Sequence, residues 1–294
     1  MVIEQPKISV ILNAFKRTEY LEMQIEAINN QSLKVDKIYV WQNKGGVIPD
    51  KVKDKVVLCE CSENLGVWAR FAFALNLKTE YICLFDDDTI PGSKWLQNCY
   101  ETSLTHSGLL GARGLKYLSK RSYEPYVDVG WKEPNSQVER VDIVGHCWFF
   151  KRDYLAHFWS ELPPIDSTPT AGEDIHFSYM LQKFGLNTFV PPHPVDNIDM
   201  WGSLPEIGRE AGGNSAAISK GVDSASKFDK VYSYYISKGF KLCLDRKERM
   251  SHGIVIGSDI RNNSMLRRLV SKSPILKKVG SFVVQSLRKF KIHV

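Results

Sequence analysis

Short apolar runs rich in β-branched residues alternate with amphipathic stretches over the first third of the chain. The apolar runs predict strands, and they cover residues 7–13, 37–43, 55–60 and 81–85. The amphipathic stretches predict helices, and they cover residues 17–31, 64–77 and 93–106. Strands that alternate with helices favour a mostly parallel sheet that is covered on both faces.

The second half has a less regular pattern. Strands are expected within residues 108–117, 139–151 and 186–190, and a helix within residues 172–185, where the apolar positions have helical spacing. Residues 191–226 read as loop, with several glycines. There is no internal repeat, so we expect a catalytic domain over residues 1–260 and a separate tail over residues 261–294.

The composition suits a globular protein of this kind. The 294 residues are 43% hydrophobic and 11% aromatic, which is enough to bury a large core. The six cysteines form no CxxC pair or zinc pattern, which predicts neither a disulfide framework nor a structural metal site. No secretory signal and no run of about 20 apolar residues are seen, so we expect a cytoplasmic protein.

The net charge of +6 comes from the tail. Residues 261–294 hold nine Lys and Arg and no acidic residue; removing those nine from 39 leaves 30 basic against 33 acidic residues, a net −3 for residues 1–260. A nucleic-acid partner is therefore not expected. Basic and apolar residues together in the tail suggest an amphipathic anchor on an anionic membrane surface, on the inner face of the membrane; a helix packed on the domain and a solubilising tail are the alternatives.

Three aspartates, Asp86, Asp87 and Asp88, directly follow the apolar run YICLF. Residues i and i+2 of an extended segment face one side, so we expect Asp86 and Asp88 to converge and Asp87 to point away. Two such carboxylates at the carboxyl end of a strand suit Mg²⁺ or Mn²⁺. A turn before Pro91 is the structural alternative. A haloacid-dehalogenase phosphatase is a second alternative, disfavoured because three predicted strands come first and Ile90 replaces Thr or Val.

Several motifs in order resemble those of GT-A glycosyltransferases. The stretches ILNAFKRTEYL, IYVWQN, NLGVWARF and LFDDDT are similar to family 2 transferases and to the exostosin-like N-acetylhexosaminyltransferase domain. The resemblance covers residues 7–193. It implies a GT-A fold, which is a Rossmann-like, mostly parallel sheet flanked by helices, with the basic helical tail added. It also implies a nucleotide-sugar donor, UDP by preference, and a bound Mn²⁺ or Mg²⁺.

The resemblance also implies roles for individual residues on the donor side. The positions that match donor-binding groups are Asn13, Phe15, Arg17, Asn43, Asn64, Arg70, Asp86 and Asp87. Asp86 and Asp88 match the metal-binding positions. Phe15 could equally be a buried aromatic residue. Arg70, a lone charge on an apolar helix, needs an anionic partner, either the ligand or one of the aspartates.

The pair Glu173 and Asp174 opens a predicted helix. By resemblance, Asp174 is the catalytic carboxylate and Glu173 supports it or binds the acceptor; helix capping is the alternative. Whether the reaction inverts or retains stays open.

Four further residues match the sugar side of the pocket or its edge. His146 and Trp148 match a strand that lines the sugar and acceptor pocket, although core packing suits Trp148 equally well. His193 matches a late histidine that adds a metal ligand, or is an ordinary loop histidine. Arg209 matches a diphosphate contact on a lid.

These residues together predict a metal-dependent glycosyltransferase that acts on a glycan or lipid-linked acceptor. A nucleotidyltransferase remains an alternative, although the chain lacks a GxGxR signature after its first strand. A non-catalytic carbohydrate- or membrane-binding module with a degenerate transferase fold is the other alternative.

Overall fold

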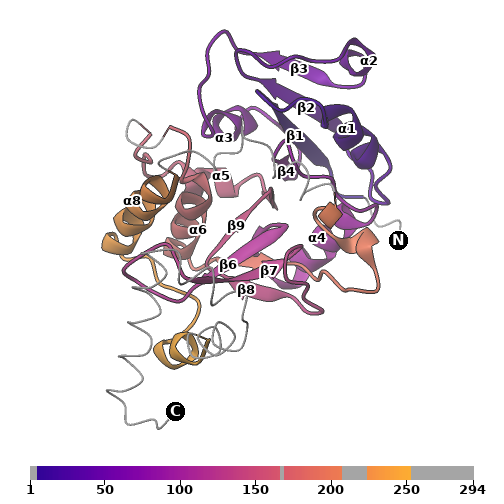
Figure 1. Ribbon diagram of the computed structural model, residues 1–294. Coiled ribbons are helices and arrows are strands. Elements are labelled where there is room, and N and C mark those ends of the chain that lie inside the picture. The colour runs from indigo at the N-terminus through magenta and orange to yellow at the C-terminus, as the bar shows by residue number, and fades with distance from the viewer. Residues whose placement is uncertain (1–4, 166–168, 207–223, 253–294) are drawn as a thin grey trace, which may run out of the picture.

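The computed structural model describes residues 5–165, 169–206 and 224–252, and it has a mixed α/β architecture (Figure 1). The strands of the first half are β1 (Ile8–Ala14), β2 (Lys37–Gln42), β3 (Val57–Glu60) and β4 (Tyr81–Phe85). The later strands are β5 (Gly108–Leu110), β6 (Arg113–Tyr117), β7 (Tyr126–Gly130), β8 (Glu139–Val141), β9 (Ile143–Gly145), β10 (Cys147–Lys151) and β11 (Asn187–Val190). The helices are α1 (Leu21–Asn29), α2 (Asp50–Lys53), α3 (Ala69–Ala74), α4 (Trp95–Thr105), α5 (Tyr154–Phe158), α6 (Glu173–Lys183), the 3-10 helix η1 (Ile198–Met200) and α8 (Ser224–Ser237).

The main sheet has the strand order β3-β2-β1-β4-β10-β5-β11-β8. Strands β1 to β4 are mutually parallel, and so are β5 and β11, whereas β10 and β8 run in the opposite direction. The expected α/β class with a mostly parallel sheet flanked by helices is therefore confirmed. The order reverses between β1 and β4, and the crevice at such a switch point is where open α/β sheets bind ligands.

Two layers of helices cover the main sheet. Apolar residues of α1, α2 and α4 pack on one face, and those of α3, α5 and α6 pack on the other. The strands supply both layers because successive residues point to opposite faces: Val10 and Leu12 lie in one cluster, and Ile11 between them lies in the other.

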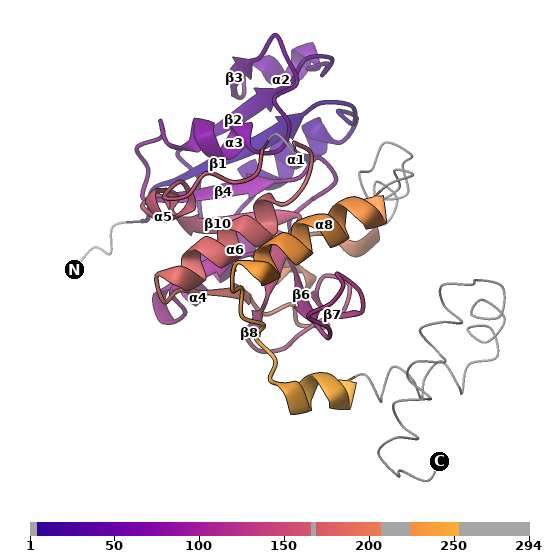
Figure 2. The same ribbon diagram turned by 90° about the vertical axis from the view of Figure 1, so that its left-hand side faces the viewer.

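A second, antiparallel sheet has the order β7-β6-β9. Its inner face, α6 and α8 enclose a third core rich in tyrosine, which includes Tyr117, Tyr179, Tyr232 and Tyr235. Helices α6 and α8 lie alongside each other (Figure 2), and the rings of Tyr179 on α6 and Tyr235 on α8 are in contact.

The helix expected over residues 64–77 is shorter than the sequence predicts. Gly66 has a left-handed backbone with φ of 70°, and a Cβ there would lie 2.0 Å from the carbonyl oxygen of Pro169. Residues 66–68 therefore form a turn against the segment before α6, and α3 begins only at Ala69.

Candidate functional site

A tight turn after β4 carries the three aspartates. The Asp86 carbonyl accepts a hydrogen bond from the Thr89 N–H at 3.2 Å. The buried Gln24 amide of α1 donates to the carbonyl oxygens of Asp86, at 2.6 Å, and of Thr89, at 2.9 Å. The sequence analysis missed Gln24. A signal existed, because this polar residue shares the apolar face of α1 with Leu21 and Ile25.

Asp86 and Asp88 converge, as expected, and a third group joins them. One ligand atom from each of Asp86, Asp88 and His146 lies within 4.8 Å of the others. Strand β4 ends at Phe85, so the turn brings the two aspartates together, and the strand alternation that we predicted is not the cause. Asp87 does not belong to this carboxylate–histidine cluster (Asp86, Asp88 and His146).

His146 enters the cluster from the residue just before β10. Its φ of 65° is left-handed, which is uncommon for a residue other than glycine. Its carbonyl accepts the Asp86 N–H at 2.9 Å, and its Nδ1 lies 3.4 Å from Asp88 Oδ1. The buried ring of Trp131 packs edge-on against the imidazole. These contacts fix the direction of the ring towards the aspartates.

Arg17, in the loop after β1, holds two of the aspartates. Its Nη1 donates to Asp88 Oδ2 at 3.1 Å, and its Nε donates to Asp87 Oδ2 at 3.2 Å. Its Nη2 donates to Asp87 Oδ1. This contact follows from the parallel register of β1 and β4, which pairs Leu12 with Phe85 and so brings the two loops out side by side.

The two neighbouring aspartates have pKa values shifted in opposite directions. Burial raises the pKa of Asp87 to about 6, against the opposing charge and hydrogen bond of Arg17. Burial acts in the same sense on Asp88, but His146 and Arg17 outweigh it and lower the pKa of Asp88 to about 2. Asp88 is therefore firmly ionised at neutral pH, as a metal ligand must be.

Arg70 connects the cluster to the second acidic pair. This buried guanidinium donates to Asp86 Oδ1 at 2.8 Å and to Glu173 Oε1 at 3.3 Å. Its Cζ also lies 4.6 Å from the centre of the Trp148 ring. The anionic partner that the sequence required for Arg70 thus includes Asp86, and Glu173 is a second partner that the sequence did not reveal.

Glu173 and Asp174 form the first turn of α6, and both have raised pKa values. Burial raises the pKa of Glu173 to about 8, with a contribution from the charge of Asp174 and partial compensation by Arg70. Burial raises the pKa of Asp174 to about 6. The charge of Asp86 adds to this rise, and the Ile175 N–H, which donates to the carboxylate, opposes it. Both carboxyl groups therefore hold a proton more readily than exposed ones, as is common for carboxyl groups at functional sites.

His193 does not lie in the cluster, although its sequence context suggested a metal ligand. Its Nδ1 lies 2.8 Å from the carbonyl oxygen of Pro191, and its Nε2 accepts the Gly202 N–H at 3.1 Å. Burial lowers the pKa of His193 to about 4. Both ring nitrogens of a neutral, buried imidazole thus serve to fasten the loop, and the histidine beside the aspartates is His146 instead.

The other predicted donor residues lie around the ends of β1 and β2. Asn13 is at the end of β1, and Phe15 follows in the loop before Arg17, half-buried. Asn43 is buried, and its Oδ1 accepts hydrogen bonds from the Trp41 indole and from the Leu65 N–H.

The remaining predicted residues lie farther out, in the core or outside the described chain. Asn64 is exposed and caps the turn at Gly66. Trp148 is 2% exposed and packs in the core, under Arg70. Arg209 and the tail over residues 261–294 lie outside the described residues.

No family model matches the chain, and no curated protein matches it. Solved structures do match it. One is the mannosyltransferase PcManGT from Pyrobaculum calidifontis, in complex with GDP-Man and Mn²⁺; the sequence identity is 13%, the TM-score is 0.46, and the match covers 96% of this chain and 88% of that chain. At this level of likeness, the chemistry of the present chain rests on its own residues.

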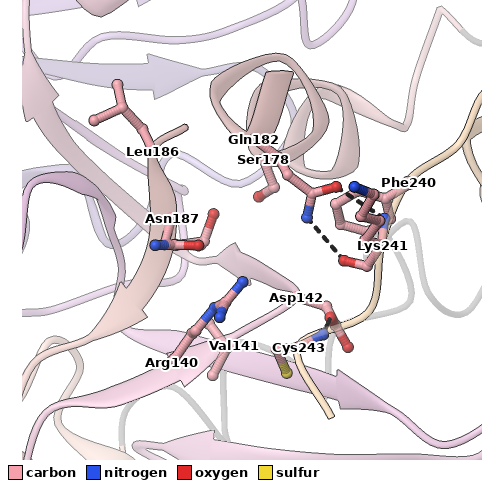
Figure 3. Close-up of a pocket in the computed structure, with 11 residues that line it drawn as sticks. Arg140, Val141, Asp142, Ser178, Gln182, Leu186, Asn187, Phe240, Lys241 and Cys243 are labelled. Atoms are coloured by element: carbon pink, nitrogen blue, oxygen red, sulfur yellow. Dashed lines mark hydrogen bonds between the residues drawn. The ribbon is translucent and has the colours of Figure 1, made fainter. Parts of the chain in front are cut away.

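Two cavities lie away from these carboxylates. A cavity of about 10 Å³, the room of one water molecule, lies between α6, β8 and the segment after α8 (Figure 3). There, Gln182 exchanges two hydrogen bonds with the backbone of Lys241.

A wider cavity, of about 500 Å³, is lined by residues that include Lys7 and Glu80, which precede β1 and β4. It therefore opens at the amino ends of the parallel strands, the edge opposite to the aspartates, where ligands of such sheets are not expected.

Within the described part of the chain, no helix has the length and apolar character that crossing a membrane requires.

Proposed function

We propose that this protein is a metal-dependent glycosyltransferase of the GT-A type, which moves a sugar from a nucleotide sugar to a glycan or lipid-linked acceptor. The observation that carries the proposal is the position of Arg70, which bonds to both Asp86 and Glu173. One guanidinium thereby joins a candidate metal site, at the switch point of the sheet, to a carboxyl pair with raised pKa values. Sugar transfer needs both parts: a site for the leaving diphosphate and a base for the acceptor hydroxyl.

The donor set of the cluster fits Mg²⁺ or Mn²⁺. Carboxylate oxygens suit both ions, and an imidazole is also a common ligand of Mn²⁺. Asp86, Asp88 and His146 would hold the ion, which when bound supplies a Lewis acid for the charge that builds on the leaving diphosphate. Their three ligand atoms leave coordination positions for phosphate oxygens and water.

The donor would lie along the carboxyl ends of β1, β2 and β4. Asn13, Phe15 and Arg17 leave β1 at this edge, next to the turn of the aspartates. Asn43 already uses its Oδ1 to fix the loop after β3, so we assign it to shaping the nucleotide site. By the family resemblance the nucleotide is UDP, with Arg209 as a further diphosphate contact.

Asp174 would accept the proton of the acceptor hydroxyl. One of its oxygens, Oδ1, takes the Ile175 N–H at 2.7 Å, which fixes the carboxylate while the other oxygen can reach a substrate. Glu173, held by Arg70, would position the acceptor or keep the charge balance of the site. His146, as a ligand of the ion, would stand between the metal and the sugar.

The decisive experiment is a titration of nucleotide sugars, with UDP and GDP donors, in the presence and absence of Mn²⁺. We expect at least one donor to bind, and its affinity to fall on the order of 10²-fold without Mn²⁺ or in Asp88→Asn, because several kcal/mol of metal–diphosphate attraction disappear. Asp153→Asn, at a side chain that is 85% exposed, is the matched control and should bind like the wild type. Binding that is absent for every donor, or indifferent to Mn²⁺ and to Asp88, would falsify the proposal.

The reaction products separate the rival activities. A glycosyltransferase releases a nucleoside diphosphate from the nucleotide sugar, and a nucleotidyltransferase releases inorganic diphosphate from a nucleoside triphosphate. A binding module releases neither. Chromatography of the reaction mixture therefore identifies the class even before the acceptor is known.

A further inference from the structure

Two arginines each engage one oxygen of a carboxylate in the cluster. Arg70 Nη1 donates to Asp86 Oδ1 at 2.8 Å, and Arg17 Nη1 donates to Asp88 Oδ2 at 3.1 Å. The oxygen of Asp88 that faces His146 is the other one, Oδ1, at 3.4 Å from the imidazole Nδ1. Each carboxylate thus turns one oxygen to a guanidinium. Besides the imidazole, the other oxygen of Asp88 has only a long contact with the Thr89 hydroxyl, at 3.5 Å, among the hydrogen bonds of the described residues. We assign the second oxygen of each carboxylate to a cation.

Both guanidinium groups are themselves held in place. Arg70 is buried, also bonds to Glu173, and lies over the Trp148 ring. Arg17 is anchored by Asp87, which accepts hydrogen bonds from Nε and Nη2 while only Nη1 reaches Asp88. This gives the middle aspartate a distinct task, because Asp87 fixes the arginine, whereas Asp86 and Asp88 belong to the carboxylate–histidine cluster.

A carboxylate with one oxygen engaged binds a cation through one oxygen only. Three single-atom protein ligands suit Mg²⁺ and Mn²⁺, which take octahedral coordination and keep several water or phosphate ligands. Ca²⁺ takes six to eight oxygens and gains from carboxylates that bind through both. The arrangement therefore disfavours Ca²⁺.

We propose that Arg17 and Arg70 are specificity-determining residues that make Asp86 and Asp88 single-oxygen ligands and so exclude Ca²⁺ from the site. The inference rests on the proposed metal site. It adds a role for residues that do not touch the ion: Arg17 and Arg70 act through the two carboxylates, and Asp87 acts through Arg17.

The test measures Mn²⁺ affinity by the electron paramagnetic resonance signal of free Mn²⁺, and Ca²⁺ affinity by displacement of bound Mn²⁺, on the full chain without nucleotide. The readout is the ratio of the two dissociation constants. Both ions carry the same charge, so a change in local charge alters both affinities and leaves the ratio nearly unchanged. We expect Arg17→Gln to move the ratio towards Ca²⁺ by about tenfold, because Asp88 gains a second oxygen for the larger ion.

Two further variants keep the inference testable. Asp87→Asn weakens the anchor of Arg17 and should move the ratio in the same direction as Arg17→Gln, although the two substitutions change the local charge in opposite senses. Arg17→Lys retains one donor for Asp88 and should stay closer to the wild type. Lys16→Gln is the matched control, because Lys16 is exposed beside Arg17 and its ammonium lies over the Phe15 ring.

The outcomes separate the two proposals. A folded wild-type protein that binds neither ion overturns the metal site and this inference with it. If Mn²⁺ binds but the ratio is the same in the wild type, Arg17→Gln and Asp87→Asn, the arginine role is wrong while the metal site stands. A shift that Lys16→Gln reproduces would also overturn the role of Arg17.

Discussion

Two regions of the molecule bury carboxylates, and they satisfy them in different ways. Asp142, between β8 and β9, is 3% exposed, and both of its oxygens accept main-chain N–H groups, from Tyr117 at 2.7 Å and from Cys243 at 2.5 Å. In the turn after β4, by contrast, side-chain cations hold Asp86 and Asp88.

The difference separates a structural carboxylate from a functional one. Main-chain donors cannot leave without local unfolding, so Asp142 ties the segment after α8 to β6. Arginine side chains can share a carboxylate with an incoming cation or exchange it for a phosphate. Burial alone thus does not distinguish the two regions, whereas the kind of donor does.

Asp174→Asn should give the largest loss of activity. Removal of a general base typically lowers turnover 10²- to 10⁴-fold, and we expect a loss of about 10³-fold. Donor affinity should hardly change, because the role proposed for Asp174 is on the acceptor side. Steady-state kinetics, with the donor that the nucleotide-sugar titration identifies, measures both quantities. Turnover within tenfold of the wild type would remove Asp174 from the mechanism.

Asp142→Asn should show the opposite behaviour. The Asn side chain offers one carbonyl oxygen where two N–H groups need acceptors, and this should lower the free energy of unfolding by about 2 kcal/mol. Turnover per folded molecule should persist. Urea unfolding followed by circular dichroism measures the loss, with Asp153→Asn as the exposed control. If Asp142→Asn abolishes donor turnover in a folded protein, the distinction between the two regions fails.

The pH dependence of stability tests the region around Arg70. Glu173 has a pKa of about 8 in the folded state, above its ordinary value of 4.5, so the folded state binds more protons than the unfolded state between these values. The contribution of Glu173 to the unfolding free energy therefore falls as the pH rises from 5 to 8.

Glu173→Gln should remove this dependence. The difference in unfolding free energy, variant minus wild type, should therefore rise as the pH increases from 5 to 8. Glu161 is a partly exposed carboxylate that forms an ion pair with Lys183 of α6, and Lys183 lowers its pKa. Glu161→Gln should therefore show no such rise. A difference for Glu173→Gln that is flat across this pH range would contradict the raised pKa.

Removal of the residues after Asn263 should affect neither carboxylate region. We expect the truncated protein to lose binding to anionic liposomes, since each Lys or Arg near such a surface contributes about 1 kcal/mol. Donor hydrolysis should stay within about twofold of the full chain. Sedimentation with vesicles of anionic and of neutral lipid measures the first effect, and unchanged binding to anionic vesicles would refute a membrane anchor.

The first half of the fold could be predicted from the sequence because its parallel strands are nearly continuous apolar runs. Strands β1 to β4 lie where these runs are, and the aspartates follow β4. In the small sheet, β6 and β9 lie within ranges where strands were expected, whereas β7 lies in a stretch for which the sequence pattern indicated no element. The start of α3 also depended on the close approach of Gly66 to Pro169, about 100 residues away.

For the site, single residues were easier to predict than their partners. The isolated charge of Arg70 pointed to an anionic neighbour, but the choice of Glu173 depends on how α6 docks. The same limit explains the two histidines. His193 has the sequence context of a ligand, yet His146 is the one that the reversed direction of β10 brings beside Asp88.

The main-chain bond between Asp86 and His146 has a consequence for protein engineering. The segment DDDT carries only two of the three ligand atoms, and the third arrives on a neighbouring antiparallel strand through a left-handed residue. The site is therefore not a portable linear motif. A graft into another sheet would have to include the β4–β10 strand pair and the left-handed histidine as one unit.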